Sequence, residues 1–411
     1  MSITTTLPKV VAVETRTLDP TQNLRGTRIL VIMPSVPVQG MERSNLQIMK
    51  MMRRRGAEVL FVVERLSPHV PPAVQAIGCS TAPTAFYRGF ERRLHLSRDV
   101  FEMAGVLWAW ARTASEVDSI YRRYRPTHIH VTNLDYFLYA LPTLWRARCP
   151  VIFRLPAPPD TALIGYKKRL VESLWRRWVL PRCDAIICNC RYTLQQVERI
   201  GVPGSKARVI YNCLSVRLNT GASDAPRVDS SRFNIAFVGR VRPEKGVAEL
   251  FEAARRLVRE REQVDFYLAG EYEWMNPFAE DLVRRIRSEG LEHRIRIIGP
   301  IEDVLGLLEQ CDLFVFPSLK ESFPNAILEA KSQGLPSVVF PTGGIPEAVT
   351  RGLDGYICHE PSAEALYEGI RFYLDRPQEL RQAGAAARAS LDRFSERTIG
   401  DQWADLYLGL L

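Results

Sequence analysis

Residues of the kinds that build metal sites and disulfide frameworks are few in this sequence. Its 411 residues include eight cysteines and six histidines, and no two cysteines form a Cys-x2-Cys pair. Cys183, Cys188 and Cys311 lie in short apolar runs, which favours buried thiols in a reducing compartment. His128 and His130 lie two apart on a predicted strand and face the same side, with no further ligand at metal-binding spacing. We expect no metal ion and no cofactor.

A long apolar run and a leader segment are also missing. The apolar helical stretch 100–114 carries charges and is shorter than the about 20 residues that cross a bilayer. Residues 1–26 contain neither the basic start nor the apolar core of a signal peptide, so we expect a flexible N-terminal tail. Together with the cysteine usage, these absences predict a cytoplasmic protein.

Negative charge is scarce in the first half of the chain. The formal net charge is +9, of which residues 1–231 carry +16 and residues 232–411 carry −7. The basic segment 167–182 also contains Trp175 and Trp178. This composition fits a surface helix on the inner, anionic face of a membrane, and it also fits a solvated helix whose tryptophans pack on the core. Nucleic acid is not an expected partner, because no nucleic-acid motif accompanies the basic charge.

Two glutamates lie eight residues apart at a predicted strand-to-helix turn. The apolar run 311–316 ends at Pro317 and is typical of a buried parallel strand, and Pro324 suits the first turn of a helix. Glu321 then lies on the loop and Glu329 about one turn into the helix. This edge of an open α/β sheet binds ligands. A helix start favours an anion such as a diphosphate, and a carboxylate accepts hydrogen bonds from ribose hydroxyls.

Two cations follow another predicted strand, residues 234–238. Gly239 and Arg240 end this strand, and Lys245 precedes an amphipathic helix. A guanidinium fork and an ammonium group at one strand-to-helix turn suit a pyrophosphate. Further along the chain, the glycine pair 343–344 is able to bring its backbone close to a ligand.

In these elements the C-terminal half resembles the retaining glycosyltransferases of family 4, which have the GT-B fold. A Glu-x7-Glu pair alone would be a weak signal, but several elements occur here in the family's order. They are Gly239-Arg240, Lys245-Gly246, Glu321 with Glu329, Gly334-Leu335-Pro336, Gly343-Gly344-Ile345-Pro346-Glu347 and Asp354-Gly355.

The N-terminal half is similar to the family more loosely. Its loop Gln39-Gly40-Met41-Glu42-Arg43 corresponds to the family's Gly-Gly-x-Glu-Arg, so the contact with the donor phosphate that the resemblance implies rests on Gly40. Many relatives have a histidine after the strand corresponding to residues 151–154, close to the donor sugar. This chain has none there, and Arg154 or Asp160 are the candidates to replace it.

The resemblance implies an α/β protein with two doubly wound Rossmann-like domains that face each other across a cleft. We expect the acceptor-side domain at residues 27–215 and the nucleotide-sugar-binding domain at residues 232–376. The helices of residues 377–411 are expected to cross back to the first domain. Their aromatic residues are expected to pack rather than bind ligands, and they are Phe394, Trp403 and Tyr407.

The activity that the resemblance implies is transfer of a hexosyl-type sugar from a UDP, GDP or ADP sugar to a hydroxyl acceptor, with retention at the anomeric carbon. No Asp-x-Asp motif of the metal-dependent glycosyltransferases is present, so a metal-independent enzyme is expected. The acceptor is expected to be a sugar or a lipid-linked glycan in polysaccharide or glycolipid synthesis. The implied catalytic residues are Arg240, Lys245 and Glu321. The implied donor-binding residues are Gly40, Gly239, Arg240, Lys245, Glu321, Ser322, Phe323, Asn325, Ala326 and Glu329.

Three other classes of protein compete with this interpretation. A Rossmann oxidoreductase would need Gly-x-Gly-x-x-Gly after the first strand, and residues 34–40 do not supply it. A GT-B sugar-nucleotide epimerase shares the scaffold but is not expected to carry the glutamate pair together with Gly-Arg and Lys-Gly. A non-catalytic nucleotide-sugar-binding protein would keep the donor site and stays an alternative.

Overall fold

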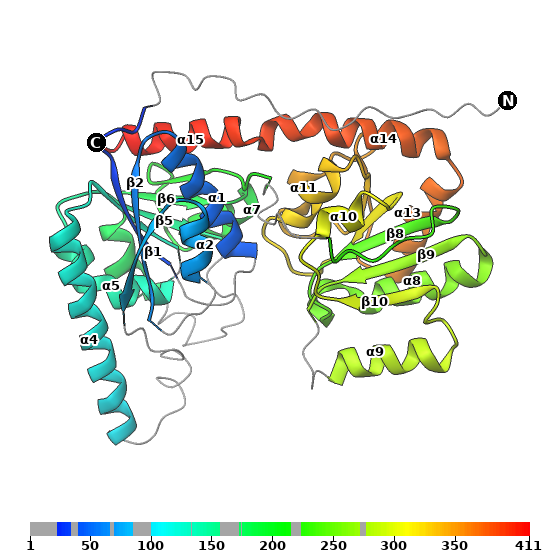
Figure 1. The fold of residues 1–411 in the computed structure, drawn as a ribbon, viewed down its shortest axis with the longest axis horizontal. Coiled ribbons are helices and arrows are strands. Elements are labelled where there is room, and N and C mark those ends of the chain that lie inside the picture. The colour runs from blue at the N-terminus through cyan, green and yellow to red at the C-terminus, as the bar shows by residue number, and fades with distance from the viewer. Residues whose placement is uncertain are drawn as a thin grey trace.

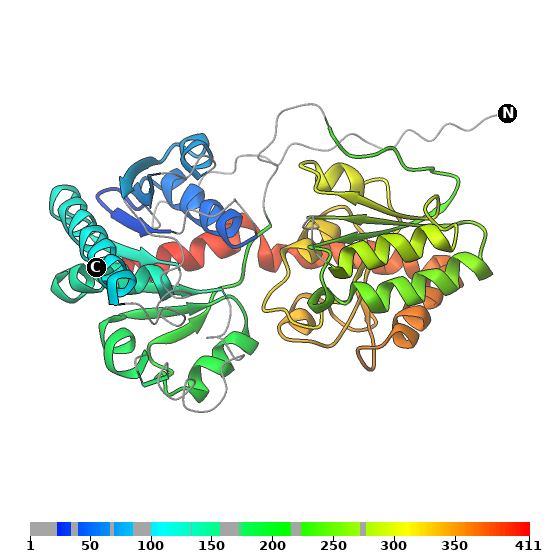
Figure 2. The same ribbon diagram turned by 90° about the horizontal axis from the view of Figure 1, so that it is seen from below.

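The computed structural model describes residues 23–33, 40–65, 70–84, 100–132, 134–156, 172–173, 175–214, 223–271 and 277–411. These residues form two parallel sheets, one in each half of the chain, and the two halves lie side by side in both views (Figures 1 and 2). The predicted α/β class with two doubly wound sheets is confirmed.

The first sheet contains seven strands in the order β3-β2-β1-β4-β5-β6-β7. Alternate residues of β1 enter different cores, with Ile29 and Val31 on one face and Leu30 and Ile32 on the other. Both faces are therefore covered, which explains the continuous apolar runs of the strands. The elements are β1 Arg28–Ile32, α1 Gly40–Arg54, β2 Glu58–Glu64, α2 Val70–Ala76, β3 Ser80–Thr84, α4 Val100–Tyr124, β4 His128–Val131, α5 Leu134–Arg146, β5 Val151–Leu155, η2 Trp175–Val179, η3 Leu180–Arg182, β6 Ala185–Cys188, α7 Arg191–Arg199 and β7 Ala207–Val209.

The second sheet contains six strands in the order β10-β9-β8-β11-β12-β13. Its strands are also buried on both faces, since Ile235 and Phe237 of β8 enter one core and Ala236 enters the other. The elements are β8 Phe233–Val238, η4 Pro243–Lys245, α8 Val247–Glu260, β9 Val264–Ala269, α9 Pro277–Ser288, β10 Ile295–Gly299, α10 Val304–Leu308, β11 Leu313–Phe316, α11 Asn325–Ser332, β12 Ser337–Val339, α12 Ile345–Ala348, β13 Gly355–Ile357, α13 Ala363–Leu374, α14 Pro377–Ala389, η5 Ser390–Phe394 and α15 Glu396–Leu408.

The last two long helices, α14 and α15, run along both halves of the molecule (Figure 1). Phe394 is buried in a core of the second domain, whereas Trp403 and Tyr407 are buried in a core of the first. The predicted packing role of these three aromatic residues is confirmed. The hydroxyl of Tyr407 is 2.7 Å from Nδ1 of His130. Burial lowers the pKa of His130 to about 3, so that this imidazole is neutral.

In the described part of the basic segment the expected regular helix is wrong, whereas the alternative of tryptophans that pack on the core is confirmed for Trp175 alone. Residues 175–182 form a π-helical turn and a 3-10 turn, and Trp175 is buried against Phe153 with ring centroids 5.4 Å apart. Trp178 remains exposed, whereas residues 157–171 lie outside the described part of the chain. Most of the expected tail, residues 1–22, also lies outside it, and Leu24 is fully buried, so the packed chain begins before residue 27.

The described residues include no helix that is both long and apolar enough to cross a membrane. They also include no group of three histidine, cysteine, aspartate or glutamate side chains placed to hold a metal ion. The prediction of buried thiols for Cys183, Cys188 and Cys311 is confirmed.

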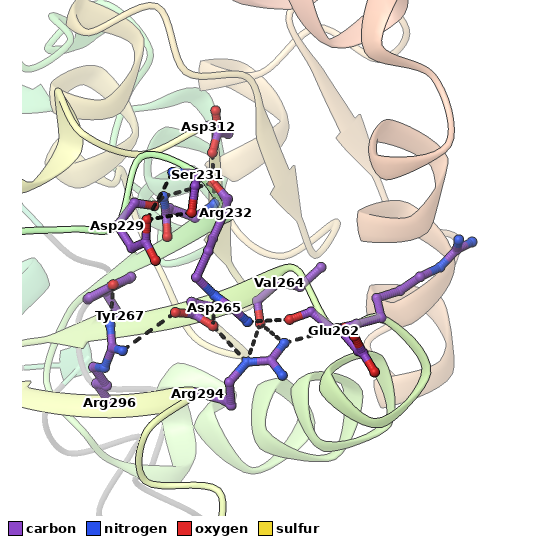
Figure 3. A network of polar contacts seen from close by, with 12 residues as sticks. Asp229, Ser231, Arg232, Glu262, Val264, Asp265, Tyr267, Arg294, Arg296 and Asp312 are labelled. Carbon is purple, nitrogen blue, oxygen red and sulfur yellow. Dashed lines mark hydrogen bonds and ion pairs between the residues drawn. The ribbon is translucent and has the colours of Figure 1, made fainter.

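Asp265, in β9, is the centre of a polar network in the second domain (Figure 3). Its carboxylate is 1% exposed and lies 2.9 Å from Nε of Arg232, 2.7 Å from Nε of Arg294 and 3.5 Å from a terminal nitrogen of Arg296. Arg232 immediately precedes β8, and the other two arginines lie at the start of β10. One buried carboxylate therefore ties together the first ends of three neighbouring strands.

Replacing Asp265 with alanine is expected to lower the free energy of unfolding by about 2–4 kcal/mol, because it leaves three guanidinium groups without their shared partner. Denaturant unfolding of the purified variant measures this change. The matched control is Asp281→Ala, which removes a 56% exposed partner of Arg284 and is expected to cost about 0.5 kcal/mol or less. Equal effects of the two substitutions would contradict the role given to Asp265.

Candidate functional site

The candidate site is at the point where the second sheet changes direction. β8 and β11 are neighbours, and the chain proceeds outward from them to opposite edges of the sheet. Ligands of open α/β sheets bind outside the carboxyl ends of the strands at such a switch point. Gly239 and Arg240 follow β8, and the loop that carries Glu321 follows β11. Arg240 is half-buried and forms no ion pair with any residue that the structure describes.

Lys245 and Glu321 form an ion pair across this switch point. Nζ of Lys245 donates to Oε2 of Glu321 over 2.7 Å, and the two side chains are 15% and 18% exposed. Gly246 permits the close approach of the two loops, because its φ is +67° and a Cβ there would lie 1.9 Å from the carbonyl oxygen of Pro317. The sequence predicts that Lys245 and Glu321 both belong to the site, but it does not predict that they form an ion pair with each other.

The glycine pair 343–344 supports the loop that carries Glu321. A Cβ on Gly343 would lie 1.7 Å from the carbonyl oxygen of Glu321, and one on Gly344 would lie 2.0 Å from that of Ser322. The Glu321 carboxylate also accepts a hydrogen bond from the N–H of Ser322 over 3.1 Å. We expected the glycine pair to approach a ligand. In the structure its close approach is to the Glu321 loop.

The start of α11 supplies the other part of the site. Pro324 is at the N-cap without a side-chain cap, and Asn325 is the first helical residue. The first N–H groups of a helix have no intrahelical acceptor, so those of Asn325 and Ala326 can bind an anion. The side chain of Phe323 is only 4% exposed and packs between Tyr211 and Phe394. Phe323 can therefore contribute only backbone atoms to a ligand.

Glu329 lies one turn further along α11 and is half-buried. Burial raises the pKa of its carboxyl group, and the positive charge of Arg43 on α1 opposes this shift. Its carboxylate accepts no hydrogen bond from any residue that the structure describes. Glu329 is therefore a free acceptor. Because Arg43 belongs to the first domain, Glu329 also lies close to the junction between the domains.

A chain of hydrogen bonds joins the start of α11 to the first domain. Nδ2 of Asn325 donates to the carbonyl oxygen of Gly40 over 3.1 Å. Oδ1 of Asn325 accepts from Nδ2 of Asn212 over 2.7 Å, and Oδ1 of Asn212 accepts from Arg154 over 2.7 Å. The predicted residues Gly40 and Asn325, which come from different domains, are thus brought into contact.

Arg154 is fully buried behind this chain of hydrogen bonds. Burial lowers the pKa of its guanidinium to about 10, and it also donates to Oγ of Ser44 over 2.8 Å and to Oδ1 of Asn45 over 2.6 Å. We expected Arg154 or Asp160 to replace a histidine at the donor sugar. Arg154 instead holds α1 and Asn212, and Asp160 lies outside the described residues. A guanidinium group inside an apolar strand requires oxygen acceptors nearby. The position of Arg154 in the apolar run 151–155 is therefore the signal in the sequence that could have indicated such partners.

Glu347 makes a second polar contact between the domains. Its carboxylate accepts from the backbone N–H groups of Arg191 and Tyr192 over 2.8 and 2.9 Å, and from the hydroxyl of Tyr211 over 2.9 Å. Arg191 begins α7, so a carboxylate of the second domain caps a helix of the first, where the helix dipole favours negative charge. Glu347 belongs to one of the sequence elements shared with the family, but no pattern in the sequence predicts this contact.

Two protein-family models match this chain. The model described as Glycosyltransferase Family 4 matches residues 38–217, and the model described as Glycosyl transferases group 1 matches residues 222–390. The two ranges lie one after the other and include every strand of the two sheets except β1. They confirm the resemblance drawn from the sequence elements.

Curated relatives match parts of this chain. Glycogen synthase of Mycobacterium tuberculosis is 29% identical over 251 residues, which are 59% of this chain and 58% of that protein. N,N'-diacetylbacillosaminyl-diphospho-undecaprenol alpha-1,3-N-acetylgalactosaminyltransferase of Campylobacter jejuni is 33% identical over 174 residues, which are 42% of this chain and 44% of that protein. The chain thus matches about half the length of these relatives.

Solved structures match nearly the whole chain. The crystal structure of HepE of Anabaena in complex with UDP and glucose has a TM-score of 0.74 at 20% identity, covering 93% of this chain and 100% of that one. Sucrose-phosphate synthase of Thermosynechococcus elongatus has a TM-score of 0.73 at 17% identity, covering 93% and 99%. At these identities the likeness shows the fold.

Proposed function

We propose that this chain, a GT-B protein that resembles the glycosyltransferases of family 4 in both halves, transfers a hexosyl-type sugar from a nucleoside diphosphate sugar to a hydroxyl acceptor. The anomeric configuration is retained. The acceptor is a sugar or lipid-linked glycan in the synthesis of a cell-surface polysaccharide or glycolipid. The Campylobacter relative is named for a diphospho-undecaprenol-linked sugar, which supports an acceptor of this kind.

The observation that carries the proposal is that three kinds of group lie in the elements that follow β8 and β11, the neighbouring strands at the switch point of the second sheet. Arg240 is a half-buried cation without a carboxylate partner among the described residues, the start of α11 offers free N–H groups, and Glu329 is a free acceptor. A nucleoside diphosphate has the complementary groups, because its diphosphate is an anion and its ribose has two hydroxyl donors. The UDP in the HepE structure supports a ligand of this class.

Each group has a separate role in the proposed reaction. Arg240 and Lys245 stabilise the negative charge that develops on the leaving diphosphate. Glu329 holds the ribose, and Glu321 accepts hydrogen bonds from hydroxyls of the donor sugar. Because Lys245 is paired with Glu321 over 2.7 Å, the group that holds the sugar and the group that holds the leaving diphosphate keep a fixed separation.

The test is an activity screen with UDP, GDP and ADP sugars, with and without a lipid extract as the source of acceptor. We expect release of a nucleoside diphosphate that depends on acceptor, and a product whose anomeric configuration, read by NMR, equals that of the donor. An inverted product would overturn retention. Nucleotide binding without transfer would indicate a binding protein, and conversion of the donor sugar without acceptor would indicate an epimerase.

Activity is expected to survive EDTA, because Arg240, Lys245 and the start of α11 carry the diphosphate charge without a divalent ion. Initial rates before and after chelation, with Mg²⁺ or Mn²⁺ added back, check this expectation. Complete loss that the added ion restores would show that the diphosphate site is wrongly assigned.

A further inference from the structure

Two exposed tryptophans from different elements form a pair on the first domain. Trp145 lies in the last turn of α5 and Trp178 in η2, with ring centroids 6.1 Å apart and ring planes at 71°. Their exposed fractions are 47% and 45%. Paired exposed aromatic rings indicate a surface that a partner covers. An indole has an apolar body and one polar N–H, which suits the boundary between water and lipid.

The position of the pair is fixed by the fold beneath it. Arg182 of η3 donates to the carbonyl oxygens of Leu144, Ala147 and Cys149, which are at the end of α5 and just beyond it. Trp175, three residues before Trp178, is buried in the core. The two elements that carry the exposed rings are therefore held together by hydrogen bonds and packing.

Positive charge accompanies the tryptophan pair in the sequence of both elements. Arg148 and Arg177 are exposed and form no ion pair with any residue that the structure describes. Arg146 and Arg176 are exposed as well, and Arg146 lies 3.4 Å from Asp118. The apolar rings and the guanidinium groups of Arg148 and Arg177 are complementary to a lipid bilayer whose interior is apolar and whose surface is negatively charged.

We propose that this surface, the tryptophan pair with Arg148 and Arg177, docks the protein on an anionic lipid bilayer. The rings enter the interfacial region and the guanidinium groups bind lipid phosphates. α4 and α5 lie on the side of the first domain that faces away from the second (Figure 1). Docking through the end of α5 therefore keeps the second domain, which carries the candidate site, clear of the bilayer. The proposal does not depend on which reaction the protein catalyses.

The test is sedimentation of the full chain with phosphatidylcholine vesicles that contain or lack phosphatidylglycerol, at low and high salt. We expect wild-type protein to bind the anionic vesicles at low salt and to be released by high salt. The double variants Trp145→Ser/Trp178→Ser and Arg148→Glu/Arg177→Glu are each expected to lower the partition coefficient at least ~10-fold.

Two matched controls separate the surface from general effects. Leu353→Ser removes a 55% exposed apolar side chain of the second domain, and Arg284→Glu reverses a charge on α9 of the same domain. Both are expected to bind as wild type. Wild-type binding by either double variant, a loss of equal size in the controls, equal binding to neutral vesicles or no wild-type binding at low salt would each overturn the proposal. The arginine variant changes only exposed side chains and remains informative if the tryptophan variant misfolds.

Discussion

Replacing Lys245 with alanine is expected to lower kcat at least ~100-fold, as loss of one contact made in the transition state does. Its Nζ is 2.7 Å from the Glu321 carboxylate, and it is one of the two cations that we propose for the leaving diphosphate. The free energy of unfolding is expected to fall by about 1–3 kcal/mol, because the pair is mostly buried and the Glu321 carboxylate loses its partner. Initial rates at saturating donor, with circular dichroism as the check on folding, measure both effects.

The matched control for Lys245 is Lys320, an exposed lysine on the loop that carries Glu321. Lys320→Ala removes the same charge from the same region and is expected to keep near-wild-type activity. Near-normal activity of a folded Lys245→Ala variant, or an equal loss in the control, would remove Lys245 from the catalytic group.

Alanine in place of Glu329 is also expected to lower turnover at least ~100-fold, since the ribose loses its acceptor and the donor is no longer held for reaction. Glu329→Gln keeps the shape of the side chain but supplies only one acceptor oxygen.

Burial raises the pKa of Glu329, so wild-type affinity for the nucleotide should fall as the pH is lowered through that raised pKa and the carboxyl group takes up a proton. Calorimetric titration with the nucleoside diphosphate over a pH series measures this.

The glutamine variant tests the assignment of the pH dependence to Glu329. Its amide does not titrate, so this acid limb of the affinity profile should disappear while the fold is retained. A Glu329→Gln variant with the wild-type acid limb, or a Glu329→Ala variant with normal turnover, would show that the ribose lies elsewhere.

Much of the candidate site is predictable because it is local in the sequence. An apolar run that ends at Pro317 predicts a strand, and the loop and helix start that follow place Glu321 and Glu329 at its carboxyl end. The same reasoning places Arg240 and Lys245 after β8. Because β8 and β11 are neighbours in the sheet, the two cations after β8 and the two glutamates after β11 lie at the same switch point.

The contacts between the domains could not be predicted in this way. Asn212 and Asn325 are 113 positions apart, and Asn325 and Gly40 are 285 positions apart, so no periodic pattern connects them. The two tryptophans of residues 175–178 show a second limit. Both are tryptophans in the same basic segment with arginines beside them. The π-helical turn nevertheless directs Trp175 into the core and leaves Trp178 on the surface.

A crystal structure of the protein with UDP, GDP or ADP, whichever binds most tightly by calorimetry, locates the donor directly. We expect the diphosphate between Arg240, Lys245 and the start of α11, with the ribose hydroxyls on the Glu329 carboxylate. A diphosphate bound at the first sheet, or a ribose without contact to Glu329, would contradict the assignment of the donor site.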